Sequence, residues 1–252
     1  PCYHSKNNHH TMLSSPHNDT YKRLTGLTTS KGLKGDGLFL LSGEKLVREF
    51  IAKPNLEVVY ELRHAGMNAI APQAEQIELS GDLFNELDVL GTHFNLLVLR
   101  QPRMEILNAE DMKTYKPKGI ELVVPIGDPG NLGAVIRSCE AFGIKRVILS
   151  REAAHPFLPK SVKASAGSVL RVALARGPAL ADFPTSCIAL DTDGVSIHAF
   201  TWPSDALLLV GEEGGGLGSS RFPTRVRIPT GRVKSLNIVV AASVTIFIAE
   251  QK

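Results

Sequence analysis

The residues most suited to chemistry lie in three glycine-containing loops, and the first loop spans residues 127–133. Its glycines allow the backbone to approach a ligand closely. Asn131 lies in this loop, and Arg137 follows within two turns of a predicted helix, so its guanidinium could reach back over the same place. The structural alternative is a capping asparagine beside a surface arginine, which is a common arrangement.

The second loop, residues 211–218, follows an apolar run and is rich in glycine, which at first suggests a dinucleotide site. Its glycines do not have the G-x-G-x-x-G spacing of such sites. The adjacent carboxylates of Glu212 and Glu213 would also repel a pyrophosphate. A neutral or cationic ligand therefore suits this loop better than NAD does.

The third loop, residues 229–235, leads into a C-terminal helix that we predict to open at Ser235. The serine hydroxyl can accept a hydrogen bond from a free backbone N–H of the first turn. Ser235 and Asn237 then lie where backbone donors and the helix dipole favour electron-rich groups. A capped helix with no further role is the alternative. The apolar residues that would bury one side of this helix recur at three- and four-residue spacing: Val239, Ala242, Ile246 and Ala249.

Alternating strands and helices position these loops in the second part of the chain. The alternation predicts an α/β fold with a mostly parallel sheet and helices on both faces, one of them 131–142 with Gly143 as its C-cap. Ligands of such sheets bind beyond the carboxyl ends of the strands, so the three loops should form one composite site. The predicted strands are 120–124, 146–149, 187–190 and 207–210, with a short helical or turn segment at 161–168.

A smaller α/β domain is predicted over residues 19–107, followed by a polar linker at 108–119 and the main domain at 120–252. Residues 1–18 carry four of the eight histidines, and we expect a disordered tail or a vector-derived remnant in preference to a metal-binding tract. The smaller domain should contain strands 38–41, 58–60, 77–80 and 94–100, and helices 44–52 and 82–90.

A basic, glycine-spaced segment opens this smaller domain. Its cations could contact phosphates, although a solvated loop is an equally open interpretation. The cations are Lys22, Arg23, Lys31 and Lys34.

Composition narrows the classes of partner. A formal net charge of +3 and a pI near 8.8 are compatible with an anionic partner but do not establish one. Cys2, Cys139 and Cys187 are odd in number and far apart, so they suggest neither a disulfide framework nor a zinc site, and a reducing, cytoplasmic setting fits best. No apolar run approaches the roughly 20 residues of a membrane span, and no secretory signal is visible. We therefore expect no membrane partner and no metal.

Three motifs together resemble the SpoU class of RNA ribose 2′-O-methyltransferases, a TrmH-like family of the SPOUT superfamily. Their order and spacing agree with that family over about residues 120–250. The matching segments are 128–138 with 141–143, then 210–217, then Ile228 and Pro229 with 235–237 and Ala241. Residues 163–167 also match a segment between the first two motifs, and residues 37–47 are more weakly similar to the ribosomal-protein-like domain that often precedes the catalytic one.

The resemblance implies a fold that general rules would not predict, because the C-terminal segment of this family threads through a loop to make a deep trefoil knot. It also implies a homodimer and S-adenosylmethionine as the methyl donor, held bent in the knot largely by backbone groups. The residues at cofactor-binding positions are Leu190, Gly211, Glu213, Ile228, Ser235, Leu236 and Asn237.

The same resemblance gives the catalytic roles. Arg137 would lie at the reacting hydroxyl, and since arginine stays protonated, we expect it to grip the adjacent phosphate and polarise the hydroxyl. A phosphate oxygen or water would then accept the proton. Asn131 would position the ribose or brace its loop, and Glu213 would order the second loop, with pairing to Arg137 as one way to do so. Ser235 and Asn237 would complete the floor of the site, and the basic segment would help to select the RNA.

Two other functions remain as alternatives. One is a non-catalytic RNA-binding protein on the same scaffold, against which the catalytic set argues. The other is a generic nucleotide-dependent α/β enzyme, which would bind ATP or NAD instead of the methyl donor. The sequence leaves open whether the RNA is ribosomal or transfer RNA, because RNA recognition depends mostly on shape and unpaired bases.

Overall fold

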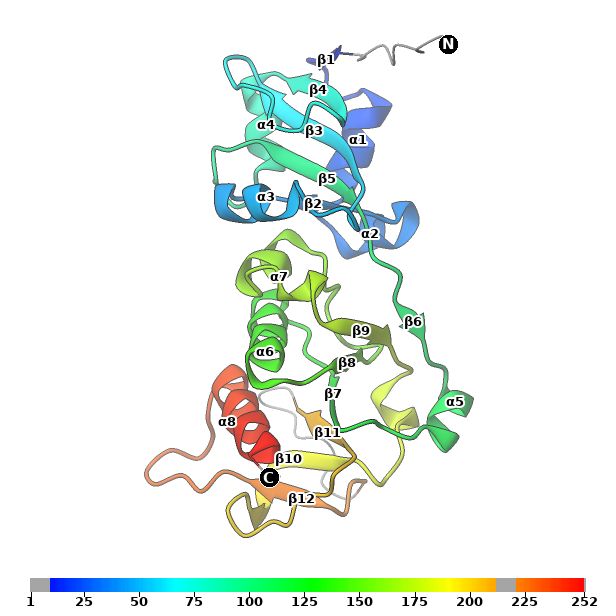
Figure 1. Ribbon diagram of the computed structural model, residues 1–252, viewed down its shortest axis with the longest axis vertical. Helices are drawn as coiled ribbons and strands as arrows, with labels where there is room; N and C mark the ends of the chain where they lie inside the picture. The colour runs from blue at the N-terminus through cyan, green and yellow to red at the C-terminus, as the bar shows by residue number, and fades with distance from the viewer. Residues whose placement is uncertain (1–9, 212–220, 252) are drawn as a thin grey trace. The chain divides into compact units, whose positions relative to one another are not determined.

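The computed structural model describes residues 10–211 and 221–251, and the chain divides into two compact units (Figure 1). Unit 1 consists of Pro1–Pro102 with Phe157–Lys163. Unit 2 consists of Arg103–Pro156 with Ala164–Lys252. Each unit has a sheet of its own.

A five-stranded mixed sheet forms the centre of unit 1, in the strand order β1-β4-β3-β5-β2. Strand β5 is antiparallel to β2 and β3, whereas β4 is parallel to β1 and β3. All four residues of β2 are buried, as expected for an apolar strand that is covered on both faces. The elements of this unit are β1 (His10–Leu13), α1 (Asp19–Gly26), α2 (Ser30–Asp36), β2 (Leu38–Leu41), α3 (Glu44–Phe50), β3 (Val58–His64), β4 (Glu75–Leu79), α4 (Gly81–Leu87) and β5 (Leu96–Arg100).

The start of unit 1 differs from the sequence-based expectation. Strand β1 lies within the expected tail, yet it pairs in parallel with β4 and buries Leu13, which supplies the apolar contact that a disordered segment lacks. The basic segment forms the helices α1 and α2 where one of our interpretations was a solvated loop. Asn18 and Thr29 accept hydrogen bonds from backbone N–H groups of the two first turns, so side-chain capping stabilises these short helices.

A seven-stranded sheet forms the centre of unit 2, in the order β12-β10-β11-β7-β8-β9-β6. Every strand pairing in its described part is parallel, which confirms the prediction of a mostly parallel sheet. The elements are β6 (Glu105–Ile106), α5 (Ala109–Thr114), β7 (Ile120–Val124), α6 (Pro129–Phe142), β8 (Arg146–Leu149), α7 (Pro159–Ala164, mostly counted with unit 1), η1 (Ser168–Leu170), β9 (Ala173–Arg176), η2 (Leu180–Asp182), β10 (Ile188–Ser196), β11 (Ala206–Val210), β12 (Arg225–Arg227) and α8 (Ile238–Glu250).

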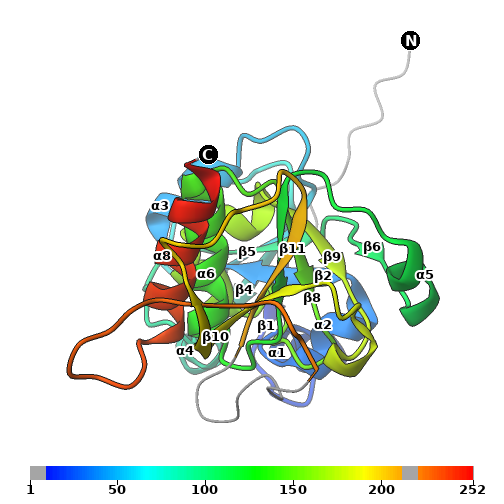
Figure 2. The same ribbon diagram turned by 90° about the horizontal axis from the view of Figure 1, so that it is seen from below.

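Helices cover both faces of this sheet. Helices α6 and α8 lie on one side of the strands and α5 on the other (Figures 1 and 2). On the α5 side, Met112 belongs to a buried apolar cluster with Val123 and Leu209. Because successive side chains of a strand point to opposite faces, their neighbours Leu122 and Leu208 are buried toward the α6 side.

Residues 108–119 are built into unit 2, although we expect a linker there. Asn108 and Asp111 form a capping box that begins α5, and Met112 of this helix is 1% exposed in the core of the unit. A second departure is the grouping of Phe157–Lys163 with unit 1, where the ring of Phe157 stacks on Phe39 with centroids 5.0 Å apart. Buried apolar side chains therefore tie both segments to a core, Met112 in the first and Phe157 with Val162 in the second.

Candidate active site

Three residues of the predicted cofactor set lie at one edge of the unit 2 sheet. Leu190 of β10 is aligned with Val210 of β11 on one side and with Val226 of β12 on the other. Gly211 directly follows Val210, and Ile228 is the first residue after β12. The register therefore places Leu190, inside β10, level with the carboxyl ends of β11 and β12, which Gly211 and Ile228 follow, and ligands of parallel sheets bind at such ends.

The first loop leaves the sheet at the same edge. Val123 of β7 is aligned with Leu209 of β11, so residues 125–128 emerge beside Gly211. The side chain of Asp128 begins α6 by accepting a hydrogen bond from the backbone N–H of Asn131 at 2.7 Å. The alternative reading of Asn131 as a helix cap is therefore wrong, because Asp128 caps the helix. Within the described residues the Asn131 carboxamide makes no hydrogen bond, which leaves it available to a ligand.

Arg137 lies on the exposed surface of α6. Six residues of helix correspond to a rise of about 9 Å and a rotation of about 600°, so its side chain points about 120° away from that of Asn131. Among the described residues its guanidinium makes no hydrogen bond or ion pair. Glu213, the residue with which it was expected to pair, lies outside the described part of the chain.

The third motif differs from the prediction at the start of its helix. Helix α8 begins at Ile238, and its N-cap is Asn237, whose side-chain oxygen accepts from the backbone N–H of Val239 at 2.9 Å. Ser235 is therefore not the cap; it is exposed in the loop before the helix. Asparagine and serine cap helices about equally well, so the sequence could not choose between them.

Helices α6 and α8 pack in parallel, which brings the first and third motifs together. The hydroxyls of Ser138 and Ser243 are 2.7 Å apart, and four residues further along both helices the rings of Phe142 and Phe247 meet edge to face with centroids 5.5 Å apart. Both helices therefore start at the same end. The first turn of α6 near Asn131 thus lies level with the cap of α8, and each helix contributes unpaired backbone N–H groups there.

One group near this edge was not expected from the sequence. Strand β10 has an irregular register between Leu190 and Val195, and the extra residues carry Asp191 and Asp193. Their carboxylates lie 4.0 and 3.3 Å from Nη1 of Arg225 in β12. Gly194 permits this bend, because a Cβ atom there would lie 2.6 Å from the backbone of Arg225. The sequence signal was the Asp191–Gly194 run, which looks like a turn and here is a bulge inside a strand.

The remaining predicted residues lie elsewhere or are partly covered. Leu236 is half-buried in the loop before α8. All four cations of the basic segment are exposed on α1 and α2 of unit 1, where Lys22 pairs with Asp19 at 3.5 Å and Arg23 with Asp36 at 3.0 Å. Lys31 and Lys34 are thus the cations of this segment that are not engaged in an ion pair with a described residue.

Residues 10–211 and 221–251 contain neither a candidate metal-binding cluster nor a candidate membrane-spanning helix. No cluster of three or more His, Cys, Asp or Glu side chains in this part of the chain has an arrangement that could hold a metal ion. No helix there has the length and apolar character required to cross a bilayer.

Comparison with known families gives one matching pattern. The pattern of the SpoU rRNA Methylase family matches residues 120–247, which include the three loops, α6 and most of α8. A similar protein from Syntrophobacter fumaroxidans, named ribosomal RNA small subunit methyltransferase G 2, is 35% identical over 93% of this chain. The alignment covers 48% of that relative, so this chain spans about half its length.

Two further relatives are similar over nearly their whole length. A Bacillus subtilis protein named 23S rRNA (guanosine(2553)-2′-O)-methyltransferase is 24% identical, with 94% of this chain and 98% of the relative aligned. The SpoU methyltransferase AviRb from Streptomyces viridochromogenes, solved in complex with the cofactor AdoMet, superposes with a TM-score of 0.76 at 23% identity. That superposition covers 93% of this chain and 97% of the other, and it shows that the two share a fold.

Proposed function

The chain belongs to the SpoU rRNA methylase family, and we propose that it transfers a methyl group from S-adenosylmethionine to a ribose 2′-hydroxyl of ribosomal or transfer RNA. The observation that carries this proposal is the meeting of three separate segments at one edge of the unit 2 sheet. The Bacillus subtilis relative is named for the same reaction on 23S rRNA, which favours a ribosomal substrate.

The residues at the edge fit the proposed methyl donor. Leu190, Ile228 and Leu236 are half-buried apolar side chains that would pack against the flat adenosine and the methylene groups. Gly211 has no side chain, so its backbone groups at the end of β11 remain open to the donor. The bound donor supplies an electrophilic methyl group, and AviRb, the relative with this fold, was solved with AdoMet.

Arg137 is the residue that we assign to the RNA side of the reaction. Its guanidinium is exposed and has no partner among the described residues, so it can bind a phosphate with two parallel hydrogen bonds. In that position it holds the adjacent ribose in line with the methyl group and polarises the 2′-hydroxyl. Because arginine remains protonated, the hydroxyl proton passes to a phosphate oxygen or to water.

The other predicted residues orient the two substrates. The Asn131 carboxamide, which does not cap α6, is assigned to the ribose. Asn237 fixes the start of α8 and, with Ser235, forms the floor of the site. Glu213 keeps its proposed role in ordering the second loop around the donor.

A homodimer is part of this proposal. Helix α8 has no charged residue before Glu250, yet Val240 and Phe247 are 49% and 46% exposed. A helix that is apolar on every side is normally buried, and exposed apolar patches mark interaction surfaces. A two-fold contact through α8 and the neighbouring surface of α6 would cover both side chains in each copy.

The same family relationship supports the trefoil knot and the assignment of RNA selection and catalysis to different parts of the chain. Helix α8 follows the edge strand β12 but packs against α6, which follows the interior strand β7. The chain therefore crosses between these positions after Arg227 and before Ile238, which supports the proposed knot. We assign RNA selection to unit 1, including Lys22, Arg23, Lys31 and Lys34, and catalysis to unit 2, into which residues 108–119 are packed. A cytoplasmic location follows from an RNA substrate of the ribosome.

The proposal is tested by methyl transfer and donor binding together. Labelled S-adenosylmethionine is incubated with unmodified ribosomal and transfer RNA pools, and donor binding is measured by calorimetry. We expect label in one pool, and a loss of about 100-fold or more in Arg137→Ala without loss of donor binding. Arg103→Ala, another exposed arginine of unit 2, is the control and should transfer label normally. Absence of donor binding in the unchanged protein would support the non-catalytic RNA-binding alternative instead.

A further inference from the structure

One edge of the unit 1 sheet gathers three loops. Leu41 at the end of β2 is aligned with Leu97 of β5, and Leu62 of β3 with Leu96. The loops after β2 and β3 and the loop before β5 therefore meet at this edge. They comprise residues 42–43, 65–74 and 88–95.

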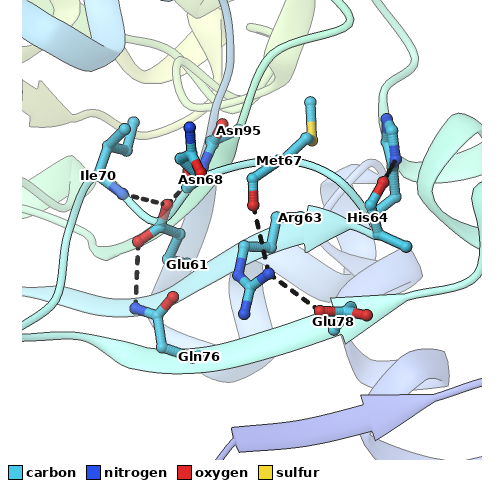
Figure 3. Close-up of polar contacts among 10 residues, drawn as sticks. Glu61, Arg63, His64, Met67, Asn68, Ile70, Gln76, Glu78 and Asn95 are labelled. Carbon is cyan, nitrogen blue, oxygen red and sulfur yellow. Dashed lines mark hydrogen bonds and ion pairs between the residues drawn. The ribbon is translucent and has the colours of Figure 1, made fainter.

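A buried carboxylate fixes two of these loops to each other (Figure 3). Glu61 is fully buried in β3 and accepts hydrogen bonds from four donors without a cation at its side. Burying an unpaired charge costs free energy unless its hydrogen bonds are satisfied. The loop conformation that supplies these donors is therefore strongly favoured over others. The donors are the backbone N–H groups of Ile70 (2.8 Å) and Ala71 (2.7 Å) and the side-chain amides of Gln76 (3.1 Å) and Asn95.

Two more contacts hold the loop 65–74 in place. The Asn95 amide also donates to the backbone carbonyl of Asn68 at 2.9 Å, which ties this loop to the start of β5. Arg63 donates to the carbonyl of Met67 at 3.3 Å while it pairs with Glu78 at 2.9 Å (Figure 3). The exposed residues of this fixed loop are Ala65, Gly66, Asn68, Ala69, Pro72 and Gln73.

The neighbouring loop holds a strained residue. His93 has a φ angle of 51°, in the left-handed region that side chains other than glycine rarely adopt. Asp88, which is 5% exposed, holds it there by accepting from the His93 backbone N–H at 2.7 Å and from the Thr92 hydroxyl at 3.0 Å. The imidazole of His93 is exposed, so the strained backbone presents a ring to solvent.

A second ring, that of Phe94, follows His93 in the chain, and a guanidinium from α3 lies over that ring. Phe94 is half-buried, and the guanidinium carbon of Arg48 in α3 lies 5.3 Å from the centroid of its ring. Arg48 is held by Glu44 at 2.8 Å, so its planar group is oriented before any ligand binds. His93, Phe94 and Arg48 together are named the stacking platform here.

We propose that the stacking platform binds unpaired nucleobases of the RNA substrate, an inference that rests on the function proposed above. Single-stranded bases stack on aromatic rings and on arginine planes, and such stacking needs no particular sequence. The fixed loop 65–74 beside the platform exposes the amides of Asn68 and Gln73, which can form hydrogen bonds with the edges of the stacked bases. Unit 1 thus selects RNA by exposed loops and bulges, in addition to the phosphate contacts of its basic helices.

The test uses the full chain and one RNA strand in two states. The strand is a hairpin whose loop carries unpaired adenosines and a fluorescent 2-aminopurine, and annealing to its complement removes every unpaired base. We expect Phe94→Leu to weaken binding of the hairpin about tenfold, to abolish the quenching of 2-aminopurine, and to leave duplex binding unchanged. Phe94→Tyr should restore both signals, and Tyr60→Leu, another partly exposed aromatic residue of unit 1, should resemble the unchanged protein.

The inference would be overturned if Phe94→Leu bound the hairpin as tightly as the unchanged protein does, or if it lost affinity equally for hairpin and duplex. Failure of the unchanged protein to bind the hairpin would also overturn it. Arg48→Ala, on an exposed helix surface, gives a second variant if Phe94→Leu does not fold, and it should weaken hairpin binding alone. Donor binding and methyl transfer are measured on the same samples. If the unchanged protein binds the hairpin with quenching of 2-aminopurine but transfers no methyl group, the proposed function is contradicted and the proposed role of the stacking platform is retained.

Discussion

Tyr115 illustrates how single residues support the site from a distance. Its hydroxyl donates to Glu121 in β7, the strand that leads into the first loop, and accepts from Nη1 of Arg146 at 3.0 Å. Burial, and then the hydrogen bond to Glu121, raise the pKa of Tyr115 to about 12, against the smaller opposing effect of Arg146. The neutral phenol is thus the form that the fold favours.

A pH dependence of stability follows from this residue. The unfolded tyrosine loses its proton near pH 10, whereas the folded one holds it to about 12. The contribution of Tyr115 to the free energy of unfolding is therefore complete below pH 10. It is lost as the pH rises toward 12, because the unfolded state binds fewer protons than the folded state in that range. Urea unfolding at a series of pH values should show a shallower decline in Tyr115→Phe than in the unchanged protein. Tyr60→Phe should retain the full decline, and an equal slope in all three proteins would refute the assignment.

At the scale of elements, helix ends decide where the site residues lie. Gly143 ends α6 with a φ angle of 90°, a left-handed conformation that glycine adopts without strain. Gly35 lies inside α2 with ordinary helical geometry and with nothing within 4 Å of an added Cβ. Both positions have room for a methyl group, but only Gly143 has a left-handed backbone, so substitutions at the two glycines isolate the effect of backbone strain.

We expect Gly143→Ala to lower the free energy of unfolding by about 1 kcal/mol through left-handed strain, although there is room for the methyl group. Gly35→Ala should instead raise it by up to about 0.5 kcal/mol, since alanine favours helix. Denaturant titrations of the two variants measure both effects. Equal changes of the same sign would show that the backbone conformation at Gly143 is not the cause.

The sequence predicted which main segments of unit 2 are helices and which are strands, and it predicted the first and last residues of these elements less well. Strands 120–124 and 146–149 have the predicted ends, because apolar runs in parallel strands have clear limits. The N-cap of helix α8 lies two residues later than predicted, since Ser235 and Asn237 are both suitable caps and only packing decides between them. The pairing of strand β12 with β10 had no local signal, because it depends on residues far away in the chain.

At the scale of the whole chain, some long-range contacts had no local signal. Phe157 follows a strand of unit 2 in sequence, yet it packs on Phe39 in unit 1, and no periodicity predicts such an excursion. The convergence of the three loops was predictable, since parallel strands send their carboxyl ends to one edge. The parallel packing of α6 on α8, which brings Asn131 level with Asn237, required the structure.

The exposed apolar face of α8 makes the oligomeric state testable. Phe247→Glu removes a side chain whose burial contributes about 2 kcal/mol per copy and places a charge in the proposed contact. We expect sedimentation velocity to show a dimer for the unchanged protein and a monomer for the variant at micromolar concentration, with retention of the helical circular dichroism. Val195→Glu changes an equally exposed valine of unit 2 outside this face and should leave the dimer intact. A Phe247→Glu protein that still dimerises would place the contact elsewhere.

The central claim is that the methyl group is placed on a ribose 2′-oxygen, and the most direct test locates that group. RNA labelled by the protein from S-adenosylmethionine is hydrolysed in alkali, which cleaves each phosphodiester through its free 2′-hydroxyl. We expect the label to be recovered in alkali-resistant dinucleotides, and we expect Arg137→Ala to reduce the amount of label about 100-fold. Label recovered in mononucleotides would place the methyl group on a base and contradict the account.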